Sequence, residues 1–149
     1  MKLIKKITAA VTAMAMAASM MSVGASADST ANWSVNYAPG APAWANHFVA
    51  NSTITVPSGS SRSSFSDVCS HFSQTTYNGA SAYLTVEAYR IKSNGQYETL
   101  YMNSFYNSYN GNFNLSQSIN ANTDLYVVHT LHNNANGCGM NGTCYFPAP

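Results

Sequence analysis

The chain has 149 residues, enough for one domain with its own core, and only 7% of them are Asp, Glu, Lys or Arg. Beyond position 27 there are three basic and five acidic residues, which gives this part of the chain a net charge of −2. Without a basic surface to neutralise phosphates, binding to nucleic acid or to an anionic membrane surface is disfavoured. The polar residues are instead mainly Asn, Ser, Thr and Tyr, which favours strands and turns over helices.

Residues 1–27 have the pattern of a secretory signal peptide. Three lysines within the first six residues precede an apolar stretch at 7–23, and Ala25-Ser26-Ala27 forms a cleavage site of small residues. The apolar stretch is shorter than the roughly 20 residues of a membrane span, and no later apolar run could span a bilayer. We therefore expect residues 28–149 to be released as an extracellular domain, from a leader of bacterial style and without integral membrane association.

Beyond the leader, short alternating runs separated by Gly, Pro and Asn clusters predict strands rather than helices. In chain order, the runs cover residues 33–37, 48–56, 64–75, 82–91, 97–106, 113–119 and 124–132, and a short hairpin closes the chain. Seven to nine strands at this spacing predict a single antiparallel β-sandwich, either immunoglobulin-like or jelly-roll-like.

Asp67, Cys69 and His71 share one face of the run 64–75 and are the residue types of a thiol nucleophile, its base and an orienting carboxylate. Side chains two apart on a strand are roughly 7 Å apart at their roots, and catalytic partners usually come from different elements. A hydrolase that uses this His/Cys/Asp cluster, or His129, is kept as an alternative function.

The segment Ser93-Asn94-Gly95 predicts a three-residue hairpin turn with Gly95 in the left-handed conformation. The strand pairs that this turn implies are Val86–Met102, Ala88–Leu100 and Arg90–Glu98. A two-residue Asn-Gly turn would shift the register by one and place polar residues opposite the aliphatic ones. The aliphatic match therefore favours the three-residue turn.

Seven residues on the other face of this hairpin, or next to it, are candidate binding residues. They are Tyr83, Tyr89, Tyr97, Tyr101, Asn103, Phe105 and Tyr109. Tyr provides a large and fairly rigid contact area with a hydroxyl group, and rings and amides suit the C–H faces and hydroxyls of sugars. This face is either exposed for recognition or covered as a second core layer. Glu87 and Glu98 fall on opposite faces, so they do not predict the carboxylate pair of a glycosidase.

His129 and His132 are three residues apart on the run 124–132, so their side chains point to opposite faces. His129 shares its face with aliphatic residues and is expected to be buried, whereas His132 lies at the strand end. Together with Cys138 and Cys144, these histidines do not have the spacing of a standard zinc site. We therefore expect neither a metal nor a cofactor.

A three-residue turn at Met140-Asn141-Gly142 would place Cys138 opposite Cys144, at the short end of the disulfide distance range. Extracellular proteins favour disulfides over free thiols. We expect a Cys138–Cys144 disulfide with Cys69 unpaired, although three cysteines allow other pairings.

These features predict a secreted, non-enzymatic binding domain that uses a Tyr- and Asn-rich sheet face to recognise a glycan or a host or cell-surface protein. A small secreted effector, such as an antimicrobial protein or an inhibitor, is an alternative within the non-enzymes. The hydrolase is the alternative from another class.

Overall fold

The computed structural model describes residues 30–36, 47–59, 61–72, 76–77, 80–132 and 139–147. The predicted signal peptide and Cys138 lie outside these residues. The strands are β1 (Thr30–Asn36), β2 (His47–Thr55), β3 (Arg62–Phe72), β4 (Thr76–Tyr77), β5 (Ala80–Ser81), β6 (Tyr83–Ile91), β7 (Tyr97–Phe105), β8 (Tyr109–Ile119), β9 (Asp124–His132) and β10 (Gly139–Tyr145). The prediction of an all-β fold is confirmed.

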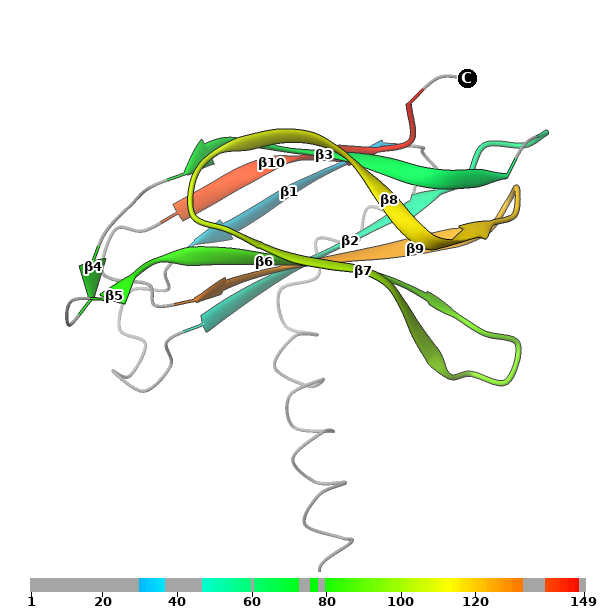
Figure 1. Ribbon diagram of the computed structural model, residues 1–149, viewed down its shortest axis with the longest axis horizontal. Coiled ribbons are helices and arrows are strands. Elements are labelled where there is room, and N and C mark those ends of the chain that lie inside the picture. Colours follow the sequence, from blue (N-terminus) through cyan, green and yellow to red (C-terminus); the bar gives the residue numbers. More distant parts are fainter. Residues whose placement is uncertain are drawn as a thin grey trace, which may run out of the picture.

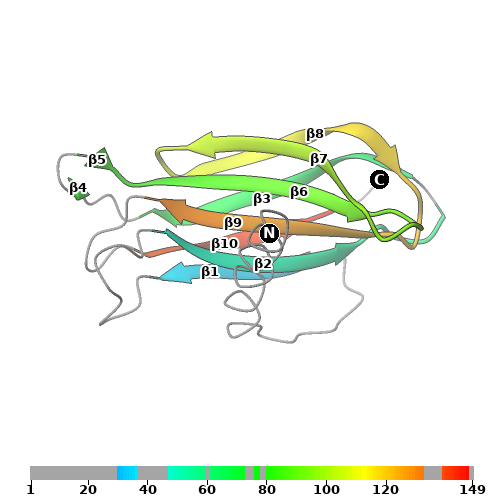
Figure 2. The same cartoon turned by 90° about the horizontal axis from the view of Figure 1, so that it is seen from below.

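Eight of these strands form two antiparallel sheets that pack face to face (Figures 1 and 2). Sheet I has the strand order β1-β10-β3-β8, and sheet II has the order β2-β9-β6-β7. Strand β1 pairs with β10, β2 with β9, β3 with β8 and β6 with β7, so the two halves of the chain run side by side like one long folded hairpin. This is the strand order of a jelly roll, which decides between the two predicted types of sandwich.

The interior of the sandwich is filled by every second residue of the strands, as the alternating pattern predicts. Leu84 and Val86 of β6 and Leu125 and Val127 of β9 are 0% exposed. Burying a side chain of this size stabilises the fold by about 1.5–3 kcal/mol. Because one set of residues points inward, the alternate set on the same strands faces the outside of sheet II.

The tip of the β6–β7 hairpin confirms the predicted turn. Gly95 has a φ of 78°, in the left-handed region, and the N–H of Lys92 donates to the carbonyl of Gln96 at 2.9 Å. Arg90 lies opposite Glu98, as the three-residue turn requires.

Farther from the turn, the predicted register is wrong. The pairing shifts by one residue at Leu100, so Val86 lies opposite Asn103 and Ala88 lies opposite Tyr101. The extra residue of this bulge allows Leu100 and Tyr101 to pack against the core together. This packing involves residues of other strands and is not visible in the hairpin sequence.

The predicted hairpin at the end of the chain is also wrong. Residues Gly139–Tyr145 form one continuous strand, which pairs with β1 on one side and β3 on the other. Gly142 is not a turn residue: it lies opposite Trp33, and a Cβ atom there would be 2.7 Å from the Trp33 ring.

The turn that was expected to place Cys138 opposite Cys144 is therefore absent, and Cys138 itself lies outside the described residues. Cys144 is a free and buried thiol. Five steps of extended strand, about 16 Å, separate it from Gly139, so these two residues do not meet across a turn. Cys69 is also a free thiol, as expected.

Candidate functional site

The outer surface of sheet II gathers aromatic side chains from strands that are far apart in the sequence, and we call it the aromatic face. It is formed by the outward residues of β9, β6 and β7 and by the turn that follows β7. The large hydrophobic side chains that are exposed in the described part of the chain are Ile91, Tyr97, Met102 and Tyr106. All four belong to the β6–β7 hairpin or to the turn after it.

One row of rings crosses the strands near one end of the aromatic face, and we call it the His132 row. Tyr83 lies opposite His132 in the β6–β9 register, and their rings stack with centroids 4.5 Å apart. On its other side Tyr83 stacks with Tyr106 at 5.4 Å. Tyr106 is 55% exposed, so the row ends in a ring that solvent can reach.

A second row crosses the same strands near the other end, and we call it the Tyr126 row. Tyr89 lies opposite Tyr126, and these rings stack with centroids 5.5 Å apart. Tyr97 contacts Tyr89 edge-on at 5.1 Å and is 57% exposed. Burial raises the pKa of both Tyr89 and Tyr126. Their phenols therefore remain hydrogen-bond donors at neutral pH.

Hydroxyl and carboxylate groups lie among the two rows. The hydroxyls of Thr85 and Ser104 hydrogen-bond to each other at 3.2 Å across β6 and β7. The Thr99 hydroxyl donates to the carboxylate of Glu87 at 2.9 Å. Glu87 lies next to Met102 in the register, and Met102 is 63% exposed. The aromatic face thus offers both stacking surfaces and polar groups.

The structure divides six of the seven predicted binding residues into two groups. Tyr83, Tyr89 and Tyr97 lie together on the aromatic face, in the two rows. The side chains of Tyr101, Phe105 and Tyr109 point the other way and pack against the core. The first group therefore lies on the outer surface, whereas the second forms a core layer. Asn103 is exposed on the edge strand β7, where its side-chain oxygen accepts the N–H of Ser104.

Packing between the sheets explains why the side chains of Tyr101, Phe105 and Tyr109 point inward. Phe65 and Phe113, from β3 and β8, form an aromatic cluster with them between the sheets. Tyr101 stacks on Phe113 at 4.9 Å, and Phe105 stacks on Tyr109 at 4.0 Å. The bulge at Leu100 places Tyr101 and Phe105 of β7 on the inner side, and Tyr109 joins them from β8.

Three members of the rows were not among the predicted binding residues: Tyr106, Tyr126 and His132. Tyr126 and His132 lie at even positions of the run 124–132, opposite in parity to Leu125, Val127 and Leu131, and that signal could have placed them on an outer face. Their contact with β6 could not have been found in the same way, because β6 and β9 are distant in the chain. Tyr106 lies in a turn, where parity gives no information.

A second group of functional residue types lies between the two sheets, and we call it the buried polar cluster. The carboxylate of Asp67 accepts the indole N–H of Trp33 at 2.9 Å and the phenol O–H of Tyr109 at 2.5 Å. His129 Nε2 lies 3.0 Å from the same carboxylate, and the His129 ring stacks on Trp33 at 3.9 Å. Since His129 comes from sheet II and the other three come from sheet I, the cluster ties the sheets together.

The buried polar cluster replaces the predicted His/Cys/Asp arrangement. The irregularity in the β10–β3 pairing places His71 opposite the exposed Asn141, and His71 itself is exposed. Asp67 faces inward, where its histidine partner is His129. Both residues are 0% exposed, so no substrate can touch them in this conformation.

The thiols near this cluster are poor nucleophiles at neutral pH. Burial, with the charge of Asp67, raises the pKa of Cys69 to about 11 and that of Cys144 to about 12. Burial and Asp67 also raise the pKa of Tyr109 far above its usual range. A nucleophilic thiol needs the opposite shift, toward thiolate.

His129 was expected to be buried, and it is, but its hydrogen bonding is incomplete. Nε2 faces Asp67, while Nδ1 makes no hydrogen bond to the described residues. His132 stacks on Tyr83 on the other side of the sheet, as strand parity predicts. The described residues contain no group of three or more His, Cys, Asp or Glu side chains that could hold a metal ion.

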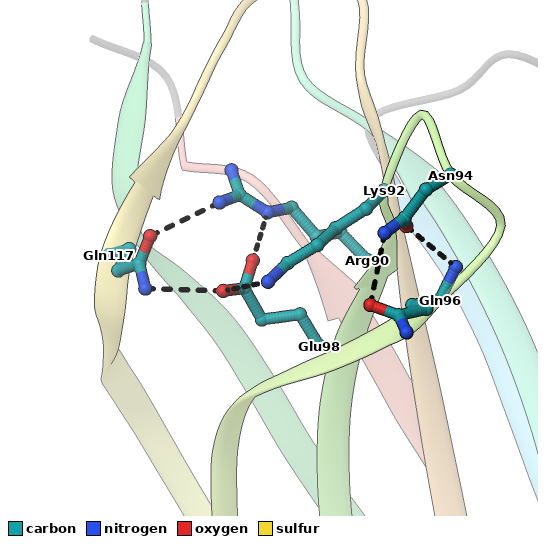
Figure 3. Close-up of polar contacts among 6 residues, drawn as sticks. All are labelled: Arg90, Lys92, Asn94, Gln96, Glu98 and Gln117. Atoms are coloured by element: carbon teal, nitrogen blue, oxygen red, sulfur yellow. Dashed lines mark hydrogen bonds and ion pairs between the residues drawn. The ribbon is translucent and has the colours of Figure 1, made fainter.

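A charged network joins the two sheets at the end near the β6–β7 turn (Figure 3). The carboxylate of Glu98 accepts Arg90 Nε at 2.6 Å and lies 3.0 Å from Lys92 Nζ. Gln117 of β8 bridges to both Arg90, at 3.1 Å, and Glu98, at 3.3 Å. The neighbouring cations lower the pKa of Glu98. Both of the hairpin's cations are thus engaged at the end of the sandwich, and Glu98 lies on the face opposite to Glu87, as predicted.

No protein-family model matches the chain, and no curated protein matches it significantly. Among solved structures, the chain is similar to the crystal structure of a protein from Sulfurospirillum deleyianum, with a TM-score of 0.43 and 8% sequence identity. The match covers 80% of this chain and 98% of that chain. A likeness of this size carries no information about function. Within the described residues, no helix has the length and hydropathy to cross a membrane.

Proposed function

We propose that this protein is a secreted, non-enzymatic binding domain whose aromatic face recognises a glycan. The observation that carries this proposal is the pair of aromatic rows on one outward-facing side of sheet II. Sugar rings pack their C–H faces on aromatic rings, and their hydroxyls hydrogen-bond to phenol, hydroxyl and carboxylate groups. Both kinds of group are present on this face.

The groups between the rows favour a glycan over a protein partner. The centre of a protein–protein interface is usually depleted of charged residues. Here the carboxylate of Glu87 lies between the Tyr126 row and the His132 row, with the hydroxyls of Thr85, Thr99 and Ser104 near it. A surface of this composition suits a ligand that carries many hydroxyl groups.

The interior supports a binding role over a hydrolytic one. A general base and a nucleophile must reach the substrate. His129 and Asp67 are 0% exposed, and the pKa of Cys69 is raised to about 11. The buried polar cluster is better explained as a structural link between the sheets.

The test is binding of the purified protein to a glycan array and to immobilised polysaccharides. We expect binding that is reduced at least tenfold when Tyr97 and Tyr106 are both replaced by Ala. Tyr145→Ala is the matched control, because Tyr145 lies on β10 in sheet I. Tyrosine-dependent binding to a protein ligand without any glycan binding would assign the aromatic face to protein recognition instead.

A further inference from the structure

The aromatic face consists of two separate rows of rings, and their separation can be obtained from the strand register. Tyr83 and Tyr89 are six residues apart on β6, and their partners His132 and Tyr126 are six residues apart on β9. At about 3.3 Å per residue, the rows are about 20 Å apart. A single sugar ring is similar in size to one tyrosine ring and can therefore occupy only one row.

Between the rows, the face carries polar groups on both sides of an apolar contact surface formed by Met102 and Val128, which lie opposite Glu87. The Thr85–Ser104 pair lies nearer to the His132 row, and the Thr99–Glu87 pair lies nearer to the Tyr126 row. An extended chain of sugars that stacks on both rows would pass over these groups and could hydrogen-bond to them along its length.

The charges on and around the aromatic face select against acidic polymers. Glu87 and Asp124 are the acidic residues among the outward residues of β6 and β9. The described cations lie elsewhere: Arg90 and Lys92 contact Glu98 at the end of the sandwich, and Arg62 belongs to β3 in sheet I. An acidic polysaccharide would meet carboxylates without a facing cation, whereas an uncharged one would not.

We propose that the ligand of the aromatic face is an uncharged, extended glycan whose chain spans both aromatic rows. This inference rests on the proposed glycan-binding function. Two linked contacts on one chain raise the apparent affinity above that of either contact alone, because the second contact forms within the complex. Affinity should therefore depend on chain length and hardly on ionic strength.

The experiment is titration calorimetry of the purified protein with disaccharides and hexasaccharides from the cellulose, xylan, mannan and starch series. For at least one series, we expect the hexasaccharide to bind at least about tenfold more tightly than the disaccharide. Tyr106→Ala and Tyr97→Ala should each abolish this length advantage, while Tyr106→Phe and the control Tyr145→Ala should retain it. Thermal melting checks that each variant is folded.

The outcomes separate this inference from the proposed function. Equal affinity for short and long chains of the same series would overturn the two-row model and leave glycan binding intact. Binding to polygalacturonate in preference to all four neutral series would overturn the charge argument. If no glycan of either kind binds, both this inference and the proposed function are wrong.

Discussion

Strand β9 contributes side chains to two environments: the buried polar cluster on its inner side and the aromatic face on its outer side. On its inner side, His129 is 0% exposed, stacks on Trp33 and faces the carboxylate of Asp67. On its outer side, Tyr126 and His132 stack on tyrosines of β6 in rows that end in exposed rings. Inside, every polar side-chain atom of the buried polar cluster except His129 Nδ1 has a partner among the described residues, so these contacts stabilise the fold. Outside, the rows end in Tyr97 and Tyr106, which are more than half exposed, and this is where we propose that a ligand binds.

The largest effect that would separate the two environments is the loss of a carboxylate. In Asp67→Asn, one carboxylate oxygen becomes an NH₂ group, which must face either the indole N–H of Trp33 or the phenol O–H of Tyr109 together with His129 Nε2. We expect a loss of about 3–5 kcal/mol in the free energy of unfolding, measured by urea denaturation.

The matched control for that change is Glu87→Gln on the aromatic face. Glu87 accepts one hydrogen bond, from Thr99 in an exposed position, so a change within about 0.5 kcal/mol is expected. Equal losses in the two variants would contradict the view that the buried polar cluster is structural and the aromatic face is not.

A second large effect is expected at Gly142, which lies against the buried polar cluster. In Gly142→Ala, the new Cβ would overlap the backbone carbonyl of Val68 and press on the Trp33 ring. Because backbone atoms cannot move aside cheaply, we expect a loss of about 3 kcal/mol or failure to fold.

Gly139→Ala provides the control in the same strand. Its Cβ would approach the side-chain oxygen of Asn36 at 2.6 Å, and that exposed side chain can rotate away. Thermal melting of the two variants should therefore differ clearly. A similar melting temperature for both would show that Trp33 does not need the space above Gly142.

The buried thiols predict a loss of stability at alkaline pH. In the unfolded chain a thiol ionises near its ordinary value of 9.0, whereas burial raises the pKa to about 11 for Cys69 and about 12 for Cys144. Above about pH 9 the unfolded state binds fewer protons, so the free energy of unfolding falls as pH rises, by up to about 1.4 kcal/mol per pH unit for each thiol.

Urea denaturation at pH 8 and pH 10 measures this slope. The Cys69→Ala and Cys144→Ala variants should each lose part of it, whatever their stability at neutral pH. The same pH dependence in the double variant as in the unmodified protein would mean that the slope comes from tyrosines alone.

Two local rules, strand parity and turn sequence, predicted the fold class and part of the site. Parity separated His129 from His132, and the turn sequence placed Gly95 at its positive φ and Arg90 opposite Glu98. These features depend on neighbours in the sequence, which is why they could be read from it.

Contacts between distant strands account for the predictions that were wrong. The bulge at Leu100 depends on the aromatic cluster formed with Phe65 and Phe113, and the glycine at 142 is needed by Trp33 rather than by a turn. The Asp67–His129 contact joins positions 62 residues apart and was not expected. In each case a local pattern had two physical explanations, and a long-range contact determined which one applies.

The smallest effect on stability should come from the exposed ends of the two rows. Tyr97 and Tyr106 are more than half exposed, and each contacts one tyrosine of β6. Replacing either by Ser removes one exposed aromatic contact, so the free energy of unfolding should fall by no more than about 1 kcal/mol. Tyr109→Phe is the contrasting variant: it removes only a hydroxyl, yet that hydroxyl donates to Asp67 inside the protein, and we expect a loss of about 1.5–3 kcal/mol. If losing a whole exposed ring costs more stability than losing one buried hydroxyl, the aromatic face is part of the structural core, and its rings are not reserved for a ligand.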